Sequence, residues 1–255
     1  MEMETFKYIV SLSDTKQLYP TSSWVRISTI TMNAAYPNPV DIEKFKAEFK
    51  PMMGWSISEK PDKKFYNCVT VISKDQYTNK NVKIFPNGTI QATGCCDLAD
   101  TVRVSKRISA VINAVTGQNA EIPVDSIKTR LINTNFSVNH VLNLHTLYRE
   151  FKRDPVFTVE FNSERYSALK VKFTPVEGDK KVTVSIFSTG KVVMMTGGSL
   201  KLIAAAYRTV NEKMEDFGAK VEQTPEQEQE QYPVFMGYEF SQWVPMLKRR
   251  GIKSF

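Results

Sequence analysis

The chain has 255 residues, 42% of them hydrophobic and 24% charged, which is enough for one large domain or two small ones. No apolar stretch approaches the roughly 18 residues of a transmembrane helix, and the N-terminus lacks the basic start and long apolar core of a signal peptide. Three cysteines, Cys68, Cys95 and Cys96, are too few for a disulfide framework or a zinc site. We therefore expect an intracellular protein with no metal and no cofactor.

The charge balance is basic. There are 34 Lys and Arg against 27 Asp and Glu, which gives a net charge of +7 and an isoelectric point near 9.2. Residues 23–117 and residues 126–219 each carry five more basic than acidic side chains. A polyanionic partner fits this balance, although many basic proteins bind no nucleic acid.

The first half of the chain begins with an N-terminal lead, residues 1–22. The apolar spacing then predicts a strand, a short helix, a strand, a hairpin and a long helix, at residues 24–32, 39–49, 65–73, 82–94 and 99–115. The hairpin reads Val-Lys-Ile-Phe-Pro-Asn-Gly-Thr-Ile-Gln-Ala-Thr-Gly, with a tight turn at Asn87-Gly88.

The second half repeats this order after a short linker at residues 117–125. The same five predicted elements recur about 102 to 104 residues later, at 128–136, 142–151, 166–174, 184–197 and 200–214. We predict an α+β fold in which two copies join edge to edge into one curved antiparallel sheet with helices on one face. The other face would be bare, and a bare apolar face of that size usually marks a binding site.

The remainder of the chain is a Glu/Gln-rich linker, residues 220–231, and a tail, residues 232–255. The tail carries Phe240, Trp243 and Leu247, and is either a docking helix or a partner-binding segment. We expect a chain that ends at Lys220 to fold and to keep its function.

The duplicated Ile-Phe-x-x-Gly pattern with a following Thr-Gly, placed between a strand and a long helix, resembles the TATA-binding protein family. The resemblance covers residues 23–217, as repeats 23–117 and 126–219, and the divergence is typical of a large DNA virus. It implies a pseudo-twofold saddle with helices on the convex face, which binds double-stranded DNA in the minor groove and bends it. Aromatic wedges unstack base steps in such a complex.

The resemblance implies a set of DNA-contacting residues. The intercalating positions are Phe65, Phe85, Tyr166 and Phe187, and the Tyr166 hydroxyl would need water or a phosphate as a partner. The groove-facing positions are Val25, Ile27, Thr29, Gln91, Thr93, Thr129, Leu131, Asn133 and Thr196, with Lys191 on a phosphate. Val25 and Thr129 stand where the family has asparagines, Gln91 replaces an apolar residue, and Met194-Met195 adds one residue before Thr196, which predicts a β-bulge.

The resemblance also implies partners. Glu164 matches an acidic residue that holds a transcription factor IIB-like protein, and Arg103, Lys106 and Arg107 would lie on a face that docks transcription partners, including the RNA polymerase machinery. The protein would be a monomer on DNA, in the nucleus, in a cytoplasmic viral factory or in the virion.

Other interpretations remain open. The phenylalanines could be core residues, the Thr-Gly pairs could only end strands and cap helices, and the basic residues could be a solvated face. The saddle could be an interaction platform that has lost DNA binding, or a substrate-binding module of a nucleic-acid enzyme. His140 and His145 are five residues apart and do not share a metal-binding helix face, so we expect no enzyme.

Overall fold

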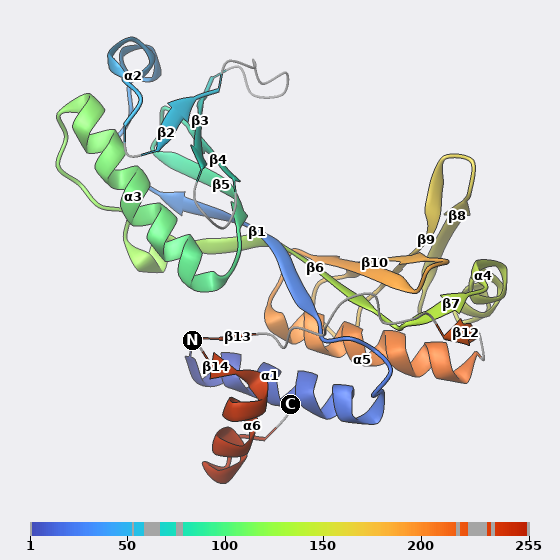
Figure 1. Ribbon diagram of the computed structural model, residues 1–255. Helices are drawn as coiled ribbons and strands as arrows, with labels where there is room; N and C mark the ends of the chain where they lie inside the picture. The colour runs from blue at the N-terminus through green and yellow to red at the C-terminus, as the bar shows by residue number, and fades with distance from the viewer. Residues whose placement is uncertain are drawn as a thin grey trace. The chain divides into compact units, whose positions relative to one another are not determined.

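The computed structural model describes residues 2–52, 54–58, 67–74, 79–217, 220–223, 234–235 and 238–253. Ten antiparallel strands hydrogen-bond in the order β2-β3-β4-β5-β1-β6-β11-β10-β9-β8 (Figure 1). The chain forms two compact units. The first-repeat unit is residues 27–132, and the second-repeat unit is residues 1–26 together with 133–255.

The first-repeat unit follows the predicted order. Its elements are β1 (Arg26–Ala35), α2 (Ile42–Glu48), β2 (Trp55–Ile57), β3 (Val69–Lys74), β4 (Asn79–Ile84), β5 (Thr89–Cys95), α3 (Leu98–Thr116) and the 3-10 turn η1 (Val124–Ser126). Asp97 caps α3 by accepting a hydrogen bond from the backbone N–H of Asp100 at 2.6 Å, and Gly117 ends the helix in a left-handed conformation. One face of the sheet and α3 share a core of fully buried side chains: Ile30, Met32, Val82, Ile84, Ile90, Ile108 and Ile112.

The second-repeat unit has the same order of elements. They are β6 (Lys128–Ser137), which begins in the first-repeat unit, β7 (His140–Leu142), α4 (Leu144–Arg153), β8 (Thr158–Asn162), β9 (Tyr166–Phe173), β10 (Val182–Phe187), β11 (Lys191–Thr196) and α5 (Leu200–Asp216). The core lies between the sheet and α5 and contains Leu169, Val184, Ile186, Val192, Met194, Leu202 and Ala206. The antiparallel α+β fold is confirmed.

The repeat extends to individual backbone hydrogen bonds. Tyr36 N donates to Gly88 O at 2.9 Å, and 102 residues later Val138 N donates to Gly190 O at 3.0 Å. Both turn glycines have positive φ angles, 79° and 83°. A Cβ at Gly88 would lie 2.4 Å from the Tyr36 carbonyl oxygen, and one at Gly190 would lie 2.3 Å from that of His140. Both hairpin turns therefore require glycine.

Two further helices complete the second-repeat unit. The N-terminal lead contains a helix, α1 (Glu2–Leu18), which packs against α5. The tail forms a docking helix, α6 (Phe240–Arg249), which packs against α1 (Figure 1). The Phe240 ring meets Trp24 edge-on at 5.8 Å between ring centres, and the Lys248 ammonium lies 2.8 Å from Asp14 Oδ1.

Three short strands, β12 (Lys220–Gln223), β13 (Val234–Phe235) and β14 (Tyr238–Glu239), precede α6. β12 pairs with β7, and β13 pairs with β14. The predicted Glu/Gln linker lies outside the described residues from 224 to 231.

Candidate nucleic-acid interface

Each strand of the large sheet alternates between a buried and an uncovered face. In β5, Ile90 and Ala92 are fully buried toward α3, whereas Thr89, Gln91 and Thr93 between them are half-exposed. Since successive side chains of a strand point to opposite faces, the uncovered face can be assigned along every strand. We call this surface the open face.

On the first-repeat unit the open face carries mostly uncharged polar side chains, together with Ile27, Ile72 and Lys83. Ile27 and Thr29 are half-exposed on β1, at the positions where the family resemblance places groove contacts. Cross-strand pairs place Thr31 opposite Thr93 and Asn33 opposite Gln91. Residues that sequence reasoning missed also belong here, and strand alternation could have found them: Thr31, Asn33, Asn81 and Lys83.

On the second-repeat unit the predicted β-bulge is wrong. β10 and β11 pair in unbroken register, with Val182 opposite Thr196 and Val184 opposite Met194. The extra residue therefore shifts the alternation: Thr196 is 2% exposed and points to the helix side, while Met195 is half-exposed on the open face. The prediction that Thr196 faces the groove side is corrected, because Met195 takes the place that Thr93 has in the first repeat.

Thr129 and Val25, which stand where the family has asparagines, differ from each other in exposure. Thr129 is half-exposed, as are Leu131 and Asn133 farther along β6. Val25 precedes β1 and is 7% exposed. The prediction that Val25 faces a groove is therefore corrected, because its side chain is buried in the protein.

Aromatic side chains stand at the hairpin ends. Phe85 and Phe187 immediately precede the two turns and are half-exposed. Tyr166 is 42% exposed, and its ring meets that of Phe187 at 5.9 Å between centres. Phe65, the predicted fourth wedge, lies outside the described residues. Glu164 is exposed in the β8–β9 turn, and Lys191 is exposed at the start of β11.

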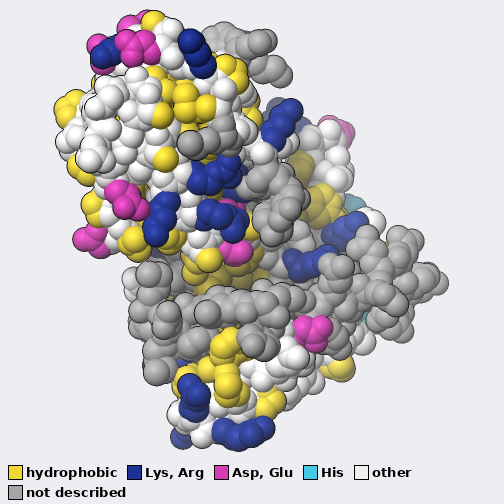
Figure 2. All heavy atoms as spheres, turned by 60° about the vertical axis from the view of Figure 1, so that its left-hand side comes forward, with side chains coloured by type: hydrophobic (Ala, Val, Ile, Leu, Met, Phe, Trp, Pro, Cys, Tyr) yellow, Lys and Arg dark blue, Asp and Glu magenta, His cyan; other side chains and the backbone are white. Residues whose placement is uncertain are grey.

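The open face carries almost no negative charge. Along the ten strands, within the described residues, its single acidic side chain is Glu160, whose Oε1 lies 3.1 Å from the Lys172 ammonium. Figure 2 shows one side of the whole molecule, on which Lys and Arg side chains lie in several small groups among hydrophobic ones. The open face thus suits an anionic ligand with apolar and hydrogen-bonding surfaces.

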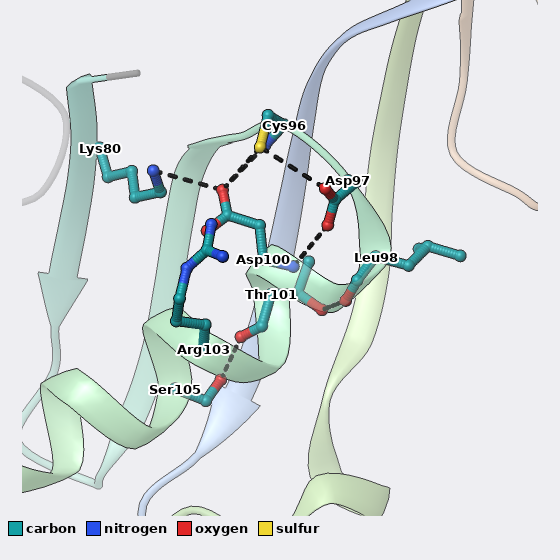
Figure 3. A network of polar contacts seen from close by, with 8 residues as sticks. All are labelled: Lys80, Cys96, Asp97, Leu98, Asp100, Thr101, Arg103 and Ser105. Carbon is teal, nitrogen blue, oxygen red and sulfur yellow. Dashed lines mark hydrogen bonds and ion pairs between the residues drawn. The ribbon is translucent and has the colours of Figure 1, made fainter. Parts of the chain in front are cut away.

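The buried side of the first-repeat unit holds a charged network (Figure 3). Lys80 and Asp100 are both fully buried, with Lys80 Nζ 3.3 Å from Asp100 Oδ2, and Arg103 pairs with Asp100 Oδ1. Cys96 donates to Asp100 Oδ2 from its backbone N–H at 3.0 Å and from its thiol at 3.3 Å. Burial would raise the pKa of Asp100, but the Cys96 hydrogen bonds and the Lys80 charge outweigh it and lower that pKa. Burial, followed by the hydrogen bond to Asp100, raises the pKa of the Cys96 thiol to about 11.

The predicted partner-docking residues of α3 have different surroundings. Arg103 is tied into the Asp100 network, although its side chain is 47% exposed. Lys106 is exposed, and the Arg107 guanidinium lies over the Trp55 ring, 5.5 Å from its centre. Arg107 therefore links α3 to β2 of the same unit, whereas Lys106 faces outward.

No group of three or more His, Cys, Asp and Glu side chains that could hold a metal ion occurs within the part of the chain that the structure describes. Over the same residues, no helix combines the length and the apolarity needed to cross a membrane.

Comparisons with known proteins agree with this fold. Residues 126–217 match the family described as transcription factor TFIID, or TATA-binding protein. A TATA-box-binding protein-like protein of Acanthamoeba polyphaga mimivirus is 22% identical over 254 residues, which cover 80% of this chain and 68% of that protein. The structure of Methanococcus jannaschii TBP matches with a TM-score of 0.56 at 16% identity, over 75% of this chain and 98% of that one.

The duplicated α+β units define a protein of the TATA-binding-protein fold. The resemblance seen in the sequence is confirmed, by the family match in the second repeat and by the mimiviral relative.

Proposed function

We propose that this chain is a TATA-binding-protein-like transcription initiation factor that binds duplex DNA in the minor groove through its open face and bends it. The observation that carries the proposal is the duplicated placement of Phe85 and Phe187, each half-exposed at a hairpin turn beside an open face with one paired carboxylate. An apolar ring at a turn has few neighbours to bury it. Insertion between base pairs removes it from water and offsets the cost of unstacking.

The chemistry of the open face supports a minor-groove ligand. The minor groove offers acceptors at both A·T and T·A pairs, so recognition there depends on hydrogen-bond donors, shape and deformability. Thr29, Thr93 and Asn133 supply hydroxyl and amide donors, while Ile27 and Leu131 supply apolar contact. Lys191 is exposed and available to a phosphate.

We propose partner contacts at two places. Glu164 in the exposed β8–β9 turn would bind a factor IIB-like protein, and the outer face of α3, with Arg103 and Lys106, would bind other parts of the initiation machinery.

A second function is favoured by one pair of observations. Val25 is packed inside the protein and Thr196 faces the helix side, so two of the nine predicted groove positions offer no groove contact. The chain would then act as an interaction platform that recruits partners with little DNA binding of its own.

Binding to an A·T-rich duplex at a series of salt concentrations separates the two functions. A DNA-binding factor gives a log-affinity that falls linearly with log salt, by about 0.9 for each phosphate contacted. A platform without DNA binding gives weak binding that Phe85→Ala and Phe187→Ala leave unchanged.

A further inference from the structure

The β9 strand carries two lysines on the open face, next to the exposed ring of Tyr166. Alternation along β9 buries Leu169, Val171 and Phe173 and turns Lys170 and Lys172 to the open face, where both are half-exposed. Neither lysine was singled out by the sequence. Their spacing from Tyr166, at four and six residues, places all three on one face of the strand.

Tyr166 is held between a ring and a cation. The Lys170 ammonium lies 4.7 Å from the centre of the Tyr166 ring, and the Phe187 ring meets Tyr166 edge-on. Ala168 lies between Tyr166 and Lys170 on the same face and opposite Phe187 in the register, yet it is only 2% exposed. The larger side chains around Ala168 therefore cover it and form one packed group.

The two lysines differ in charge compensation. Lys172 has its ammonium 3.1 Å from Glu160, on the neighbouring strand. Lys170 lies directly opposite Glu160 in the register, but no ion pair of the described residues includes it. A ring face attracts a cation without neutralising it, so the charge of Lys170 stays available to an anion.

The same cross-strand position carries one lysine in each unit. In the second-repeat unit Lys170 on β9 lies opposite Ser185 on β10, and in the first-repeat unit Thr70 on β3 lies opposite Lys83 on β4. The lysine is on the outer strand of the pair in one unit and on the inner strand in the other. Both units thus place one positive charge at this register of the open face, which is a pattern expected for a symmetric polyanion such as duplex DNA.

We propose that Lys170 and Tyr166 together bind one backbone phosphate of the duplex, with the Lys170 ammonium and the Tyr166 hydroxyl as donors. This inference rests on the proposed function. It assigns Tyr166 to the outside of the base stack and leaves Phe187 as the ring that enters it. A tyrosine inserted between base pairs would bury its hydroxyl without a partner, whereas a phosphate oxygen beside the ring accepts from the hydroxyl and from the ammonium.

Fluorescence anisotropy with a labelled A·T-rich duplex, measured from low to moderate salt, tests the inference. Lys170→Gln should lower the magnitude of the salt slope by about 0.9, the value of one phosphate. Tyr166→Phe should weaken binding about fivefold, which corresponds to about 1 kcal/mol. Because both groups serve one phosphate, the double variant should be weaker than Lys170→Gln by less than fivefold. Lys201→Gln, on the helix side of the same unit, is the matched charge control and should leave the slope unchanged.

Duplexes with one neutral methylphosphonate, moved stepwise through the site, locate the phosphate. At one position wild-type affinity should fall, while the affinity of Lys170→Gln should not fall further. The inference is overturned if Lys170→Gln keeps the wild-type slope, or if Tyr166→Phe binds as tightly as wild type, since an inserted ring needs no hydroxyl. Both of those outcomes leave the proposed function standing when Phe187→Ala still weakens binding. An absence of salt-dependent binding by the wild-type chain overturns both.

Discussion

The helix layers of the two units differ although their sheets follow one plan. In the first-repeat unit the start of α3 is anchored by the buried Lys80–Asp100 pair, and Arg103 and Lys106 are exposed on the helix. In the second-repeat unit α5 is covered by α1, and the segment after α1 bonds to it: Ser22 Oγ donates to Asn211 Oδ1, and the Tyr207 hydroxyl donates to Ser23 O at 2.9 Å.

This difference shows which features the two repeats share and which have diverged. The hairpin turns and their glycine contacts are kept to the level of single hydrogen bonds, because the sheet register depends on them. The outer helix surfaces have diverged. A partner that uses the helix layer therefore meets exposed Arg103 and Lys106 on α3, whereas α5 is covered by α1 of the chain itself.

Of the changes considered, removal of the Asp100 carboxylate from the buried pair should cause the largest loss of stability. Asp100→Asn removes the carboxylate that lies 3.3 Å from the fully buried Lys80 ammonium, and breaking a buried ion pair typically costs about 3–5 kcal/mol of unfolding free energy. Urea unfolding measures the loss, and Lys80→Met combined with Asp100→Leu should recover much of it. A loss below about 1 kcal/mol would show that the pair does not anchor α3.

The same pair predicts a pH dependence. The pKa of Asp100 is lowered in the folded state, so its contribution is present above the ordinary carboxyl pKa and is lost as pH falls through the lowered value. We expect acid destabilisation below about pH 4 that is smaller in the Lys80→Met, Asp100→Leu variant.

The next largest loss of stability should come from truncating a buried side chain of α6. Leu247→Ala removes a side chain that is 2% exposed and should cost about 2–4 kcal/mol. Leu18→Ala, at a residue 60% exposed, is the control and should cost about 0.5 kcal/mol or less. Because α6 docks on α1, a chain ending at Lys220 should lose stability rather than be unaffected. Equal melting temperatures for Leu247→Ala and wild type would refute this.

The hairpin phenylalanines should contribute strongly to DNA affinity and little to folding stability. Phe85→Ala and Phe187→Ala should each weaken duplex binding by about 2 kcal/mol, the scale of aromatic stacking on a base, with a small change in melting temperature because both rings are half-exposed. Thermal melting and anisotropy on the same samples separate the two effects. A large loss of stability in both variants would place the rings in the core.

The preference of the protein for a TATA duplex over other A·T-rich duplexes should be modest. Val25 is buried, and Thr129 has a shorter side chain than the asparagine that the family has there. Two lost contacts of about 1 kcal/mol each reduce the discrimination between a TATA duplex and other A·T-rich duplexes roughly tenfold or more. Competition between a TATA duplex and a scrambled duplex of equal A·T content measures it. A preference above about a thousandfold would show that other open-face donors, such as Asn33 and Asn133, replace them.

Sequence periodicity predicted the framework because local patterns determine it. The hairpins, α3 and α5 fall where alternation and helical spacing place them, within a few residues. The helix α1 was missed: it contacts both α5 and α6, so its buried Ile9, Val10 and Leu12 do not form one apolar stripe. The orientation of Thr196 was wrong because one added residue can either bulge out or shift the alternation, and pairing with β10 decides between them.

Binding to a duplex in which inosine–cytosine pairs replace the A·T pairs of the site tests the central claim most directly. Inosine–cytosine keeps the minor-groove edge of an A·T pair and changes the major-groove edge. Use of the open face in the minor groove predicts affinity within about threefold of the A·T duplex at fixed salt, which is a difference of less than about 1 kcal/mol. A fall to the affinity of a G·C duplex would contradict it.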